Sequence, residues 1–486
     1  MDTKKIFHMI KKIIPVLVLA MLVLAFVRCR KDEQVNNDPN LKLEFSADTI
    51  YFDTVFATVG SITIPFKVYN PSNDYINISS VNLAGNTSSN FRINVNGMSG
   101  TQFSNIEIAP KDSIFIFAEV TVDPGNVNNP FVIEDSIVFI TNGNQQKVSL
   151  VAWGQDAYFH YPDHPETAYL PAYSLISGNW PNDKPHVIYG YAVVDEDCTL
   201  VVSAGTQIYM HNDAVLWVYD GGTLKMYGAL NNEITVQGDR LDDYYRDLPG
   251  MWGKIWLSAG SIDNEIDYAI IKNGRIGIHV DTLGASPNPT LTISNTKIEN
   301  MSTAAFVAQG SYVKAGNCVF GSSGLYSVVL NIGGNYDFRH CTIANYWSQS
   351  TRNTPALVLN NYYKDVYGVY QIRDLTNAYF GNCIIYGANG DEVLLDAYSS
   401  GGVFNFTFDH CLLRTTLSIT QAGFITCLKN VSPAFINTET HDFSIAASSS
   451  AIDRGDAAVT GTILTDILGN TRIVGLAPDL GAYEKQ

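Results

Sequence analysis

The chain repeats one short phrase: Asn317-Cys318-Val319-Phe320, His340-Cys341-Thr342-Ile343, Asn382-Cys383-Ile384-Ile385 and His410-Cys411-Leu412-Leu413, with Asn295-Thr296 before Ile298 as an earlier copy. In each copy a polar residue precedes a small or thiol residue, and strand-forming residues follow. The polar residues lie 22, 23, 42 and 28 positions apart. Self-similarity at such a period is typical of a solenoid whose stacked coils bury a shared core. The stretch from Leu291 to Leu413 therefore predicts a β-solenoid with an insertion inside the 42-residue step.

Four of the seven cysteines occupy one position of this repeat. Neighbouring strands of a stack lie about 4.8 Å apart with parallel side chains, whereas a disulfide needs Cβ atoms about 3.8 Å apart that face each other. We therefore expect a row of buried free thiols. The wide spacing also excludes the closely paired cysteines of a structural zinc site.

His340 and His410 take the place that Asn317 and Asn382 hold in the other copies of the repeat. A histidine that interchanges with asparagine is expected to satisfy the backbone of a turn. The alternative is a histidine pair that binds a metal or acts as a base. The repeat favours the structural role, and the sequence predicts no metal site.

The composition favours strands over helices. The 486 residues include 12% aromatic residues, 38 glycines and only 16% charged residues. Without the segment before Cys29, the chain has 25 basic and 46 acidic residues and a net charge of −21. A strongly acidic surface repels nucleic acid and polyanionic sugars. We therefore expect an all-β protein that does not bind nucleic acid.

The N-terminal segment, residues 1–29, has the pattern of an export signal. Lysines precede the apolar run Ile13–Val27. A membrane-spanning helix needs about 20 apolar residues, so this run is short for one. The segment resembles the signal of a bacterial lipoprotein. This resemblance implies that Cys29 is lipidated and anchors the chain in a membrane, although Arg28 stands where such signals usually have a small residue.

Residues 30–41 form a tether after this cysteine. The tether begins with Arg30-Lys31-Asp32-Glu33. This run resembles the tag that sends some lipoproteins to the outer face of the outer membrane. It implies a lipid-anchored protein that faces the cell exterior. An uncleaved membrane anchor followed by a solvated charge run is the alternative.

Residues 42–156 contain short alternating strands, which we expect at 62–69, 76–83, 91–95, 113–122, 136–140 and 147–152. Three motifs resemble the immunoglobulin-like domains of the abnormal-spindle and hydin group: Phe66-Lys67-Val68-Tyr69-Asn70-Pro71, the Ala109-Pro110 turn and Val151-Ala152-Trp153-Gly154. The resemblance implies a β-sandwich that serves as a spacer or a binding module.

Residues 186–440 extend the solenoid on both sides of the repeat. Gly205-Thr206-Gln207-Ile208, Gly222-Thr223-Leu224 and Gly250-Met251-Trp252-Gly253-Lys254-Ile255 resemble coils of the pectate-lyase-like superfamily. The resemblance implies a right-handed parallel β-helix, and many such solenoids bind or display without reacting. Residues 157–185 are expected to form a connector. The predicted fold class is all-β, with an N-terminal immunoglobulin-like β-sandwich followed by a right-handed parallel β-helix solenoid.

Residues 441–486 contain Ser448-Ser449-Ser450-Ala451-Ile452-Asp453-Arg454-Gly455-Asp456 and, later, Pro478-Asp479-Leu480-Gly481-Ala482-Tyr483-Glu484. These motifs resemble the bacterial domain called choice-of-anchor Q, which implies the end of a cell-surface β-helix. The last coil of a solenoid exposes unpaired backbone groups that need covering. We therefore expect residues 441–486 to cap that coil.

The 42-residue step is the best candidate for a ligand site, because solenoid insertions gather on one face and often bind ligands there. Its aromatic side chains suit sugar rings: Tyr346, Trp347, Tyr362, Tyr363, Tyr367 and Tyr370. Tyr244 and Tyr245 form a second aromatic cluster in the loop before Trp252. The alternative is that the step makes two ordinary coils with their aromatic residues in the core.

A polysaccharide lyase or hydrolase is the rival interpretation. A lyase of this fold needs a Lys or Arg base and acidic residues that hold Ca²⁺ as a cofactor. The candidate catalytic residues are Lys364, Arg373, Asp365 and Asp374. The closely spaced aspartates of β-helix hydrolases are missing from the coils.

Together these features predict a lipid-anchored outer-membrane protein that faces the cell exterior. It is expected to bind or display without catalysis and without a cofactor, and its partners would be a polysaccharide or another surface component. A polysaccharide lyase or hydrolase is the first alternative. A structural stalk or adhesin is the second.

Overall fold

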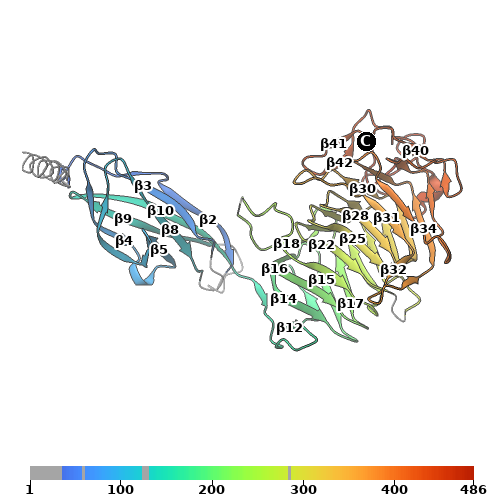
Figure 1. The fold of residues 1–486 in the computed structure, drawn as a ribbon, viewed down its shortest axis with the longest axis horizontal. Coiled ribbons are helices and arrows are strands. Elements are labelled where there is room, and N and C mark those ends of the chain that lie inside the picture. The colour runs from blue at the N-terminus through green and yellow to red at the C-terminus, as the bar shows by residue number, and fades with distance from the viewer. Residues whose placement is uncertain (1–34, 57–60, 123–130, 243, 283–285) are drawn as a thin grey trace, which may run out of the picture. The chain divides into compact units, whose positions relative to one another are not determined.

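The computed structural model describes residues 35–56, 61–122, 131–242, 244–282 and 286–486. The chain divides between Gln155 and Asp156 into two compact units (Figure 1). Both units are built from strands, antiparallel in most of the first and parallel in the second. The predicted fold class, a β-sandwich followed by a parallel β-helix, is therefore confirmed. Cys29 and its signal segment lie outside the described residues.

The first unit is a sandwich of two five-stranded sheets. One sheet contains β1 (Glu44–Phe45), β3 (Ile64–Tyr69), β8 (Ser113–Val120), β5 (Phe91–Val95) and β6 (Met98–Gly100). The other contains β2 (Thr49–Phe56), β10 (Asn144–Gln155), β9 (Phe131–Thr141), β4 (Ile76–Leu83) and β7 (Gln102–Ile108). Strands β4 and β5 have the expected bounds. No strand was expected at β1, β2, β6 or β7, and the strands expected at β9 and β10 were shorter than the observed ones.

The second unit is a parallel β-helix in which each full coil contributes three strands, so that three parallel ladders run along the described solenoid. The first ladder contains β11 (Tyr158–His160), β18 (Ile234–Gly238), β21 (Ala269–Lys272), β24 (Lys297–Glu299), β27 (Val319–Phe320), β30 (Thr342–Asn345), β35 (Ile384–Gly387), β38 (Leu412–Leu413) and β40 (Leu428–Lys429). The second contains β12 (Tyr173–Leu175), β19 (Lys254–Leu257), β22 (Ile276–Val280), β25 (Ala304–Gln309), β28 (Tyr326–Asn331), β31 (Leu357–Asn360) and β36 (Val393–Asp396).

The third ladder contains β13 (Gly178–Trp180), β15 (Thr199–Ser203), β17 (Thr223–Tyr227), β20 (Asn264–Asp267), β23 (Leu291–Ser294), β26 (Tyr312–Gly316), β29 (Gly334–Arg339), β34 (Leu375–Gly381), β37 (Thr407–Asp409) and β39 (Phe424–Ile425). Two long strands, β14 (His186–Val194) and β16 (Gln207–Val218), pair within both the first and the second ladder. We call the turn between the first and second ladders the first corner, and the turn between the second and third ladders the second corner.

The solenoid starts earlier than the sequence indicated. Residues 157–185 were expected to form a connector, but their strands β11, β12 and β13 pair in parallel with β14 and β15. The ring of Trp180 stacks on that of His186 at 4.2 Å and on that of His160 at 4.5 Å. These aromatic contacts order the proline-rich stretch as the first coil.

The repeated phrase forms the turn from the third ladder to the first. Its polar residue has a positive φ in every copy: 47° at Asn295, 55° at Asn317, 50° at His340, 53° at Asn382 and 50° at His410. Among residues with a side chain, Asn and His are enriched in this left-handed region. The interchange of Asn and His therefore follows from the backbone conformation of the turn.

The six described cysteines are free, as predicted. The thiol that follows each turn residue points into the core and donates a hydrogen bond to the carbonyl two residues before it, as from Cys341 Sγ to Arg339 O at 3.3 Å and from Cys383 Sγ to Gly381 O at 3.3 Å. Cys427 follows a further turn of this kind at Thr426. The thiols therefore satisfy turn carbonyls.

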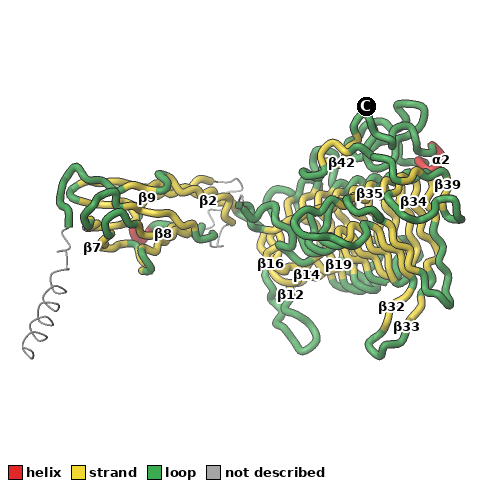
Figure 2. The backbone as a smooth tube through the Cα atoms, turned by 45° about the horizontal axis from the view of Figure 1, so that its top comes forward, coloured by secondary structure: helices red, strands yellow, loops and turns green. Residues whose placement is uncertain are grey.

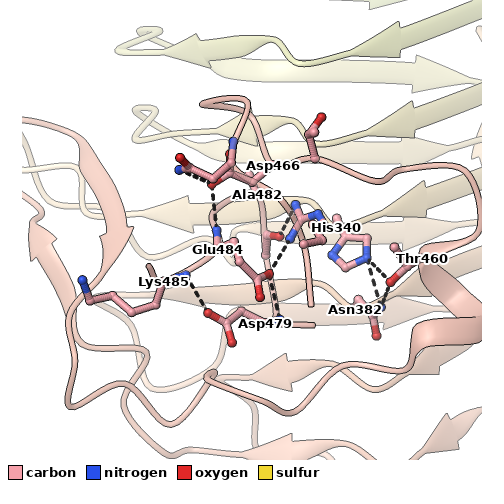
Figure 3. Close-up of polar contacts among 12 residues, drawn as sticks. His340, Asn382, Thr460, Asp466, Asp479, Ala482, Glu484 and Lys485 are labelled. Atoms are coloured by element: carbon pink, nitrogen blue, oxygen red, sulfur yellow. Dashed lines mark hydrogen bonds and ion pairs between the residues drawn. The ribbon is translucent and has the colours of Figure 1, made fainter. Parts of the chain in front are cut away.

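Residues 441–486, here called the C-terminal segment, lie along the side of the coils and contact the turns of several of them. Thr460 Oγ1 lies 2.9 Å from His340 Nε2, and the Asn382 side chain donates to Asp456 O at 2.9 Å (Figure 3). Arg472 Nη2 donates to Asn317 Oδ1 at 2.6 Å. The three turn residues belong to successive coils.

An apolar outer face explains this placement. Val319, Ile384 and Leu412 point outward from the first ladder, yet they are buried against the C-terminal segment. Phe443 and Leu480 provide part of the cover. Burial of such side chains contributes about 1.5–3 kcal/mol each.

The 42-residue step is one coil with two insertions. Residues 346–356 leave it at the first corner, and residues 361–374 leave it at the second corner. The second insertion forms a hairpin of β32 (Tyr362–Lys364) and β33 (Tyr370–Ile372), which projects from the stacked coils (Figure 2). Strand β31 separates the two insertions, and the step contains one strand of each ladder, β30, β31 and β34, so the expectations of a single insertion face and of two ordinary coils are both wrong.

Candidate functional site

At the first corner, the predicted aromatic residues are largely used in packing. The ring of Tyr346 lies 6.2 Å from that of Phe443 and 6.1 Å from that of Phe435. Trp347 lines a pocket of about 470 Å³ together with Glu299 and His441. Tyr346 is therefore part of the contact with the C-terminal segment, and Trp347 faces a separate polar pocket.

The loop after β18 also lies at the first corner. The rings of Tyr244 and Tyr245 are 4.8 Å apart, and the Arg240 guanidinium lies 3.6 Å from the centre of the Tyr245 ring. Tyr244 is 72% exposed. The second ladder separates this loop from the hairpin at the second corner, so the two predicted aromatic clusters do not form one site.

Within the hairpin, tyrosines contact one another. The Tyr362 hydroxyl donates to Asp396 Oδ2 at 3.0 Å, and its ring lies 5.8 Å from the Tyr370 ring and 5.3 Å from the Tyr398 ring. Tyr367, at the tip, is 88% exposed. Tyr362 and Tyr370 thus support the hairpin.

Two of the four predicted lyase residues, Lys364 and Asp365, make contacts within the hairpin itself. Asp365 accepts hydrogen bonds from the amides of Val369 and Tyr367 and from Gln371 Nε2, each at 2.9 Å, and these bonds lower the pKa of its carboxyl. The Lys364 ammonium lies 5.5 Å from the centre of the Tyr370 ring. Asp365 therefore closes the hairpin turn, and neither residue lines the groove described next.

Tyr363, Arg373 and Asp374 line an open groove of about 730 Å³ at the second corner. The groove crosses successive coils, and its other lining residues include Asp281, Gln309, Tyr312 and Asn335. It therefore combines phenol rings with planar amide and guanidinium groups. This composition is typical of a site that binds a polar ligand with flat faces.

Next to this groove, three side chains on the second ladder form a hydrogen-bonded relay that sequence reasoning missed. Lys254 Nζ lies 2.9 Å from His279 Nδ1, and His279 Nε2 lies 3.1 Å from Asp281 Oδ1. A lysine ammonium can only donate, so Nδ1 accepts and Nε2 carries the proton that it donates to the carboxylate. Asp281 thus holds the imidazole in one tautomer.

Trp256 completes this Lys254–His279–Asp281 relay. Its indole N–H donates to Asp281 Oδ2 at 2.7 Å, and Lys254 Nζ lies 4.1 Å from the centre of its ring. Burial lowers the pKa of Lys254. Burial alone would raise the pKa of Asp281, but the hydrogen bonds from His279 and Trp256 outweigh it and lower that pKa. The relay combines a lysine that loses its proton more readily with a fixed carboxylate.

Asp281 belongs to both the relay and the groove, and Gln309, whose Oε1 lies 3.3 Å from His279 Nε2, also lines the groove. The only sequence signal for the relay is alternation: Lys254 and Trp256 alternate with the buried Ile255 and Leu257. Alternation shows that the side chains point outward. It does not show which coil lies beside which, and that neighbourhood creates the relay.

Among the described residues, no group of three or more His, Cys, Asp or Glu side chains is arranged to hold a metal ion. The described helices also include none that is long and apolar enough to cross a membrane.

No protein-family model matches the chain, and no curated protein matches it. Among solved structures, the catalytic unit of an α-1,3-glucanase from Streptomyces thermodiastaticus is 9% identical over 72% of this chain and 79% of that chain, with a TM-score of 0.22. The PapD-like domain 7 of human CEP192 is 10% identical over 26% of this chain and 94% of that domain, with a TM-score of 0.17.

A protein of unknown function from Porphyromonas gingivalis W83 is 16% identical over 24% of this chain, with a TM-score of 0.18. The match spans about half of that protein, 51% of its length. These likenesses are too weak to carry an argument about function. The chain is an all-β protein with a sandwich and a parallel β-helix, and its function must be argued from its own site.

Proposed function

We propose that this protein is a cell-surface lipoprotein whose β-helix binds a glycan in the groove at the second corner. The groove carries the proposal, because Tyr363, Tyr312 and the planar side chains of Gln309 and Arg373 line one open space. Sugar rings present apolar faces and polar edges. Phenol rings and amide or guanidinium groups match these two features.

The anchor and the location belong to the same proposal. The export pattern that ends in Cys29, and the acidic tag after it, support lipidation and display on the outer face of the outer membrane. The choice-of-anchor Q resemblance of residues 448–484 supports a cell-surface β-helix. The sandwich would then serve as a spacer between the anchor and the solenoid.

Binding of fluorescent polysaccharides to whole cells that make the full chain tests this function. Cells with the natural sequence should bind at least one polysaccharide. The double variant Tyr363→Ala, Arg373→Ala should bind it at least tenfold more weakly, because a lost charged hydrogen bond alone costs about 1.5–3 kcal/mol. Cys29→Ser should remove the protein from the cell surface.

Tyr227→Ala is the matched control, since this exposed tyrosine lies on the third ladder, away from the groove. It should leave binding unchanged. Equal binding by the natural protein and the double variant, at equal surface amounts, would disprove the groove as the site. The absence of binding to every polysaccharide would disprove the function.

A second candidate function, a polysaccharide lyase, is favoured by the Lys254–His279–Asp281 relay. In this reaction, the Lys254 amine would take the proton from the carbon beside a uronate carboxyl. The electron pair of that C–H bond would form a C=C bond, and the glycosidic C–O bond would break. The leaving oxygen would take up a proton from water.

Incubation with polyuronates, followed by the ultraviolet absorbance of the unsaturated product, tests the lyase. The rate should rise with pH as Lys254 loses its proton, at a pH below that of an ordinary lysine because burial lowers its pKa. Lys254→Met should abolish the rise in absorbance. Lys364→Ala, in the hairpin, should not. Unchanged absorbance with the natural protein at every pH rules this candidate out.

A further inference from the structure

The outer faces of the three ladders differ in composition and in cover. From Val319 to Leu412 the outward row of the first ladder is mostly apolar, and the C-terminal segment buries it. The central outward row of the third ladder is half-buried or exposed, although the C-terminal segment contacts the ladder at Arg339, whose Nη1 donates to Val459 O at 3.4 Å. This row is mostly polar and charged: Lys225, Glu265, Thr292, Lys314 and Asp337 pair in register. On these two ladders, the apolar outward residues are thus buried and the polar outward residues remain in contact with solvent.

The second ladder breaks this pattern. One register row runs along its outer face through Leu175, Val193, Trp217, Trp256, His279, Val307, Val329, Val358 and Leu394. We call this row the apolar stripe, because His279 is its one polar member. From Trp256 onward its residues are half-buried or exposed, and Leu394 is 45% exposed. No described segment covers this part of the stripe as the C-terminal segment covers the first ladder.

A polar row runs beside the stripe on the side of the second corner. Gln309 pairs with Asn331, and Asn360 pairs with Asp396, to which its side chain donates at 3.0 Å. Asp281 follows Val280, which pairs with Ala308, so it lies next to Gln309. Asp281 and Gln309 also line the groove. The stripe, the polar row and the groove are therefore continuous.

Building on the proposed function, we propose that the ligand is an extended, linear, uncharged polysaccharide that lies parallel to the solenoid axis along the apolar stripe. Its ring faces would rest on the stripe, and its hydroxyl edges would meet the amides and carboxylates of the polar row. Coils repeat at about 4.8 Å, so the five coil steps from Trp256 to Leu394 span about 24 Å. That length accommodates several sugars.

Charge argues for an uncharged chain. The protein has a formal net charge of −17, and the polar row itself contains Asp281 and Asp396. A polyanion along the row would meet carboxylates at both ends. A contiguous exposed apolar surface of this kind marks an interaction site in a soluble unit, and an amphipathic neutral chain complements both rows.

The test is isothermal titration of the purified full chain, in detergent, with neutral β-1,4-linked oligosaccharides of glucose, xylose and mannose, from disaccharide to hexasaccharide. For the series that binds, affinity should increase with each added sugar. Val329→Asp should weaken hexasaccharide binding roughly tenfold. Val329→Thr, which keeps the shape of the side chain, should weaken it in the same direction.

Thr292→Asp is the matched control, since it adds the same charge to the exposed row of the third ladder. It should leave affinity unchanged, and thermal unfolding should show that each variant is folded. Affinity could instead be maximal already at the disaccharide and unaffected by Val329→Asp. That result would confine the ligand to the groove, and it would overturn the extended site but not the proposed function. Tighter binding of a charged series would overturn the uncharged class. If the oligosaccharides and the polysaccharides tested on cells all fail to bind, the proposed function fails as well.

Discussion

Replacing Arg352 with methionine should lower the free energy of unfolding by about 3–5 kcal/mol. Arg352 Nη2 lies 2.6 Å from Glu392 Oε1, and its Nη1 lies 2.9 Å from Glu392 Oε2. The two side chains are only 2% and 0% exposed. Without its partner, the Glu392 carboxylate would stay buried and uncompensated, and chemical denaturation would measure the loss.

The Arg352–Glu392 ion pair connects two loops of the solenoid. Arg352 belongs to the insertion 346–356 at the first corner, and Glu392 lies in the loop between β35 and β36. The Glu392 carboxylate also accepts hydrogen bonds from the amides of Ala356 and Asn389, each at 2.8 Å. One buried charge therefore orders two loops at once.

Arg275→Met is the control for this prediction. Its guanidinium forms an ion pair with Asp213 at 2.6 Å, but both side chains are 58% exposed. An exposed pair of this kind contributes about 0–1 kcal/mol. The double variant Arg352→Met, Glu392→Met should recover part of the stability lost in the single variant. Equal losses at Arg352 and Arg275 would contradict the role of burial.

Replacing Arg472 with methionine should loosen the C-terminal segment and lower stability by about 3–5 kcal/mol. Buried Arg472 donates to Asn317 Oδ1 at 2.6 Å and to Gly481 O at 3.1 Å, and its Nη1 lies 3.4 Å from Glu484 Oε2. It therefore joins Asn317, a turn residue of the repeat, to Gly481 and Glu484 of the motif Pro478–Glu484. The loss should leave the Glu484 carboxylate buried without its cation.

Two measurements separate detachment of the segment from global unfolding. Detachment would uncover the apolar outer face of the first ladder, so dye binding to exposed hydrophobic surface should increase. Limited proteolysis should cut within residues 441–486 before it cuts the coils. Arg454→Met, an exposed arginine of the same segment, is the control and should change neither measurement. A segment that resists protease in the Arg472 variant would contradict the prediction.

Some of the fold could be read from short stretches. The turn from the third ladder to the first needs a residue in the left-handed region, and Asn or His stands there. A cysteine follows at the inward position in most copies. The recurrence of this pair makes the period of the coil visible in the sequence. The same reasoning predicted free thiols, because stacked side chains point in parallel. The same reasoning gave His340 and His410 a role in the turn backbone, and both have the positive φ of that turn.

The position of the C-terminal segment could not be read in this way. The motif predicted a cap because an open coil leaves backbone groups unpaired. The structure shows that the segment follows the outer face of the first ladder, where it buries Val319, Ile384 and Leu412. Outward apolar residues of very short strands carry no periodic signal that distinguishes a covered face from an open one.

The candidate site was predictable only in part. Tyr363, Arg373 and Asp374 reach the groove, whereas Lys364 and Asp365 do not line it. The hairpin reverses direction within a few residues, and its pairing decides which side chains face the coils. The sequence shows an insertion rich in aromatic and charged residues, but not the hydrogen bonds that hold its turn.

By itself, the sequence determined the class of fold, the stacking of coils and the residue type at each turn, because these depend on local backbone conformation and on alternation along a strand. Only the tertiary structure decided which residues become neighbours between coils. Coil lengths vary from 22 to 42 residues where the repeat is visible, so equal positions along the chain do not mean equal positions in the stack. The Lys254–His279–Asp281 relay, the groove and the apolar stripe form only because stacking brings residues of different coils next to each other.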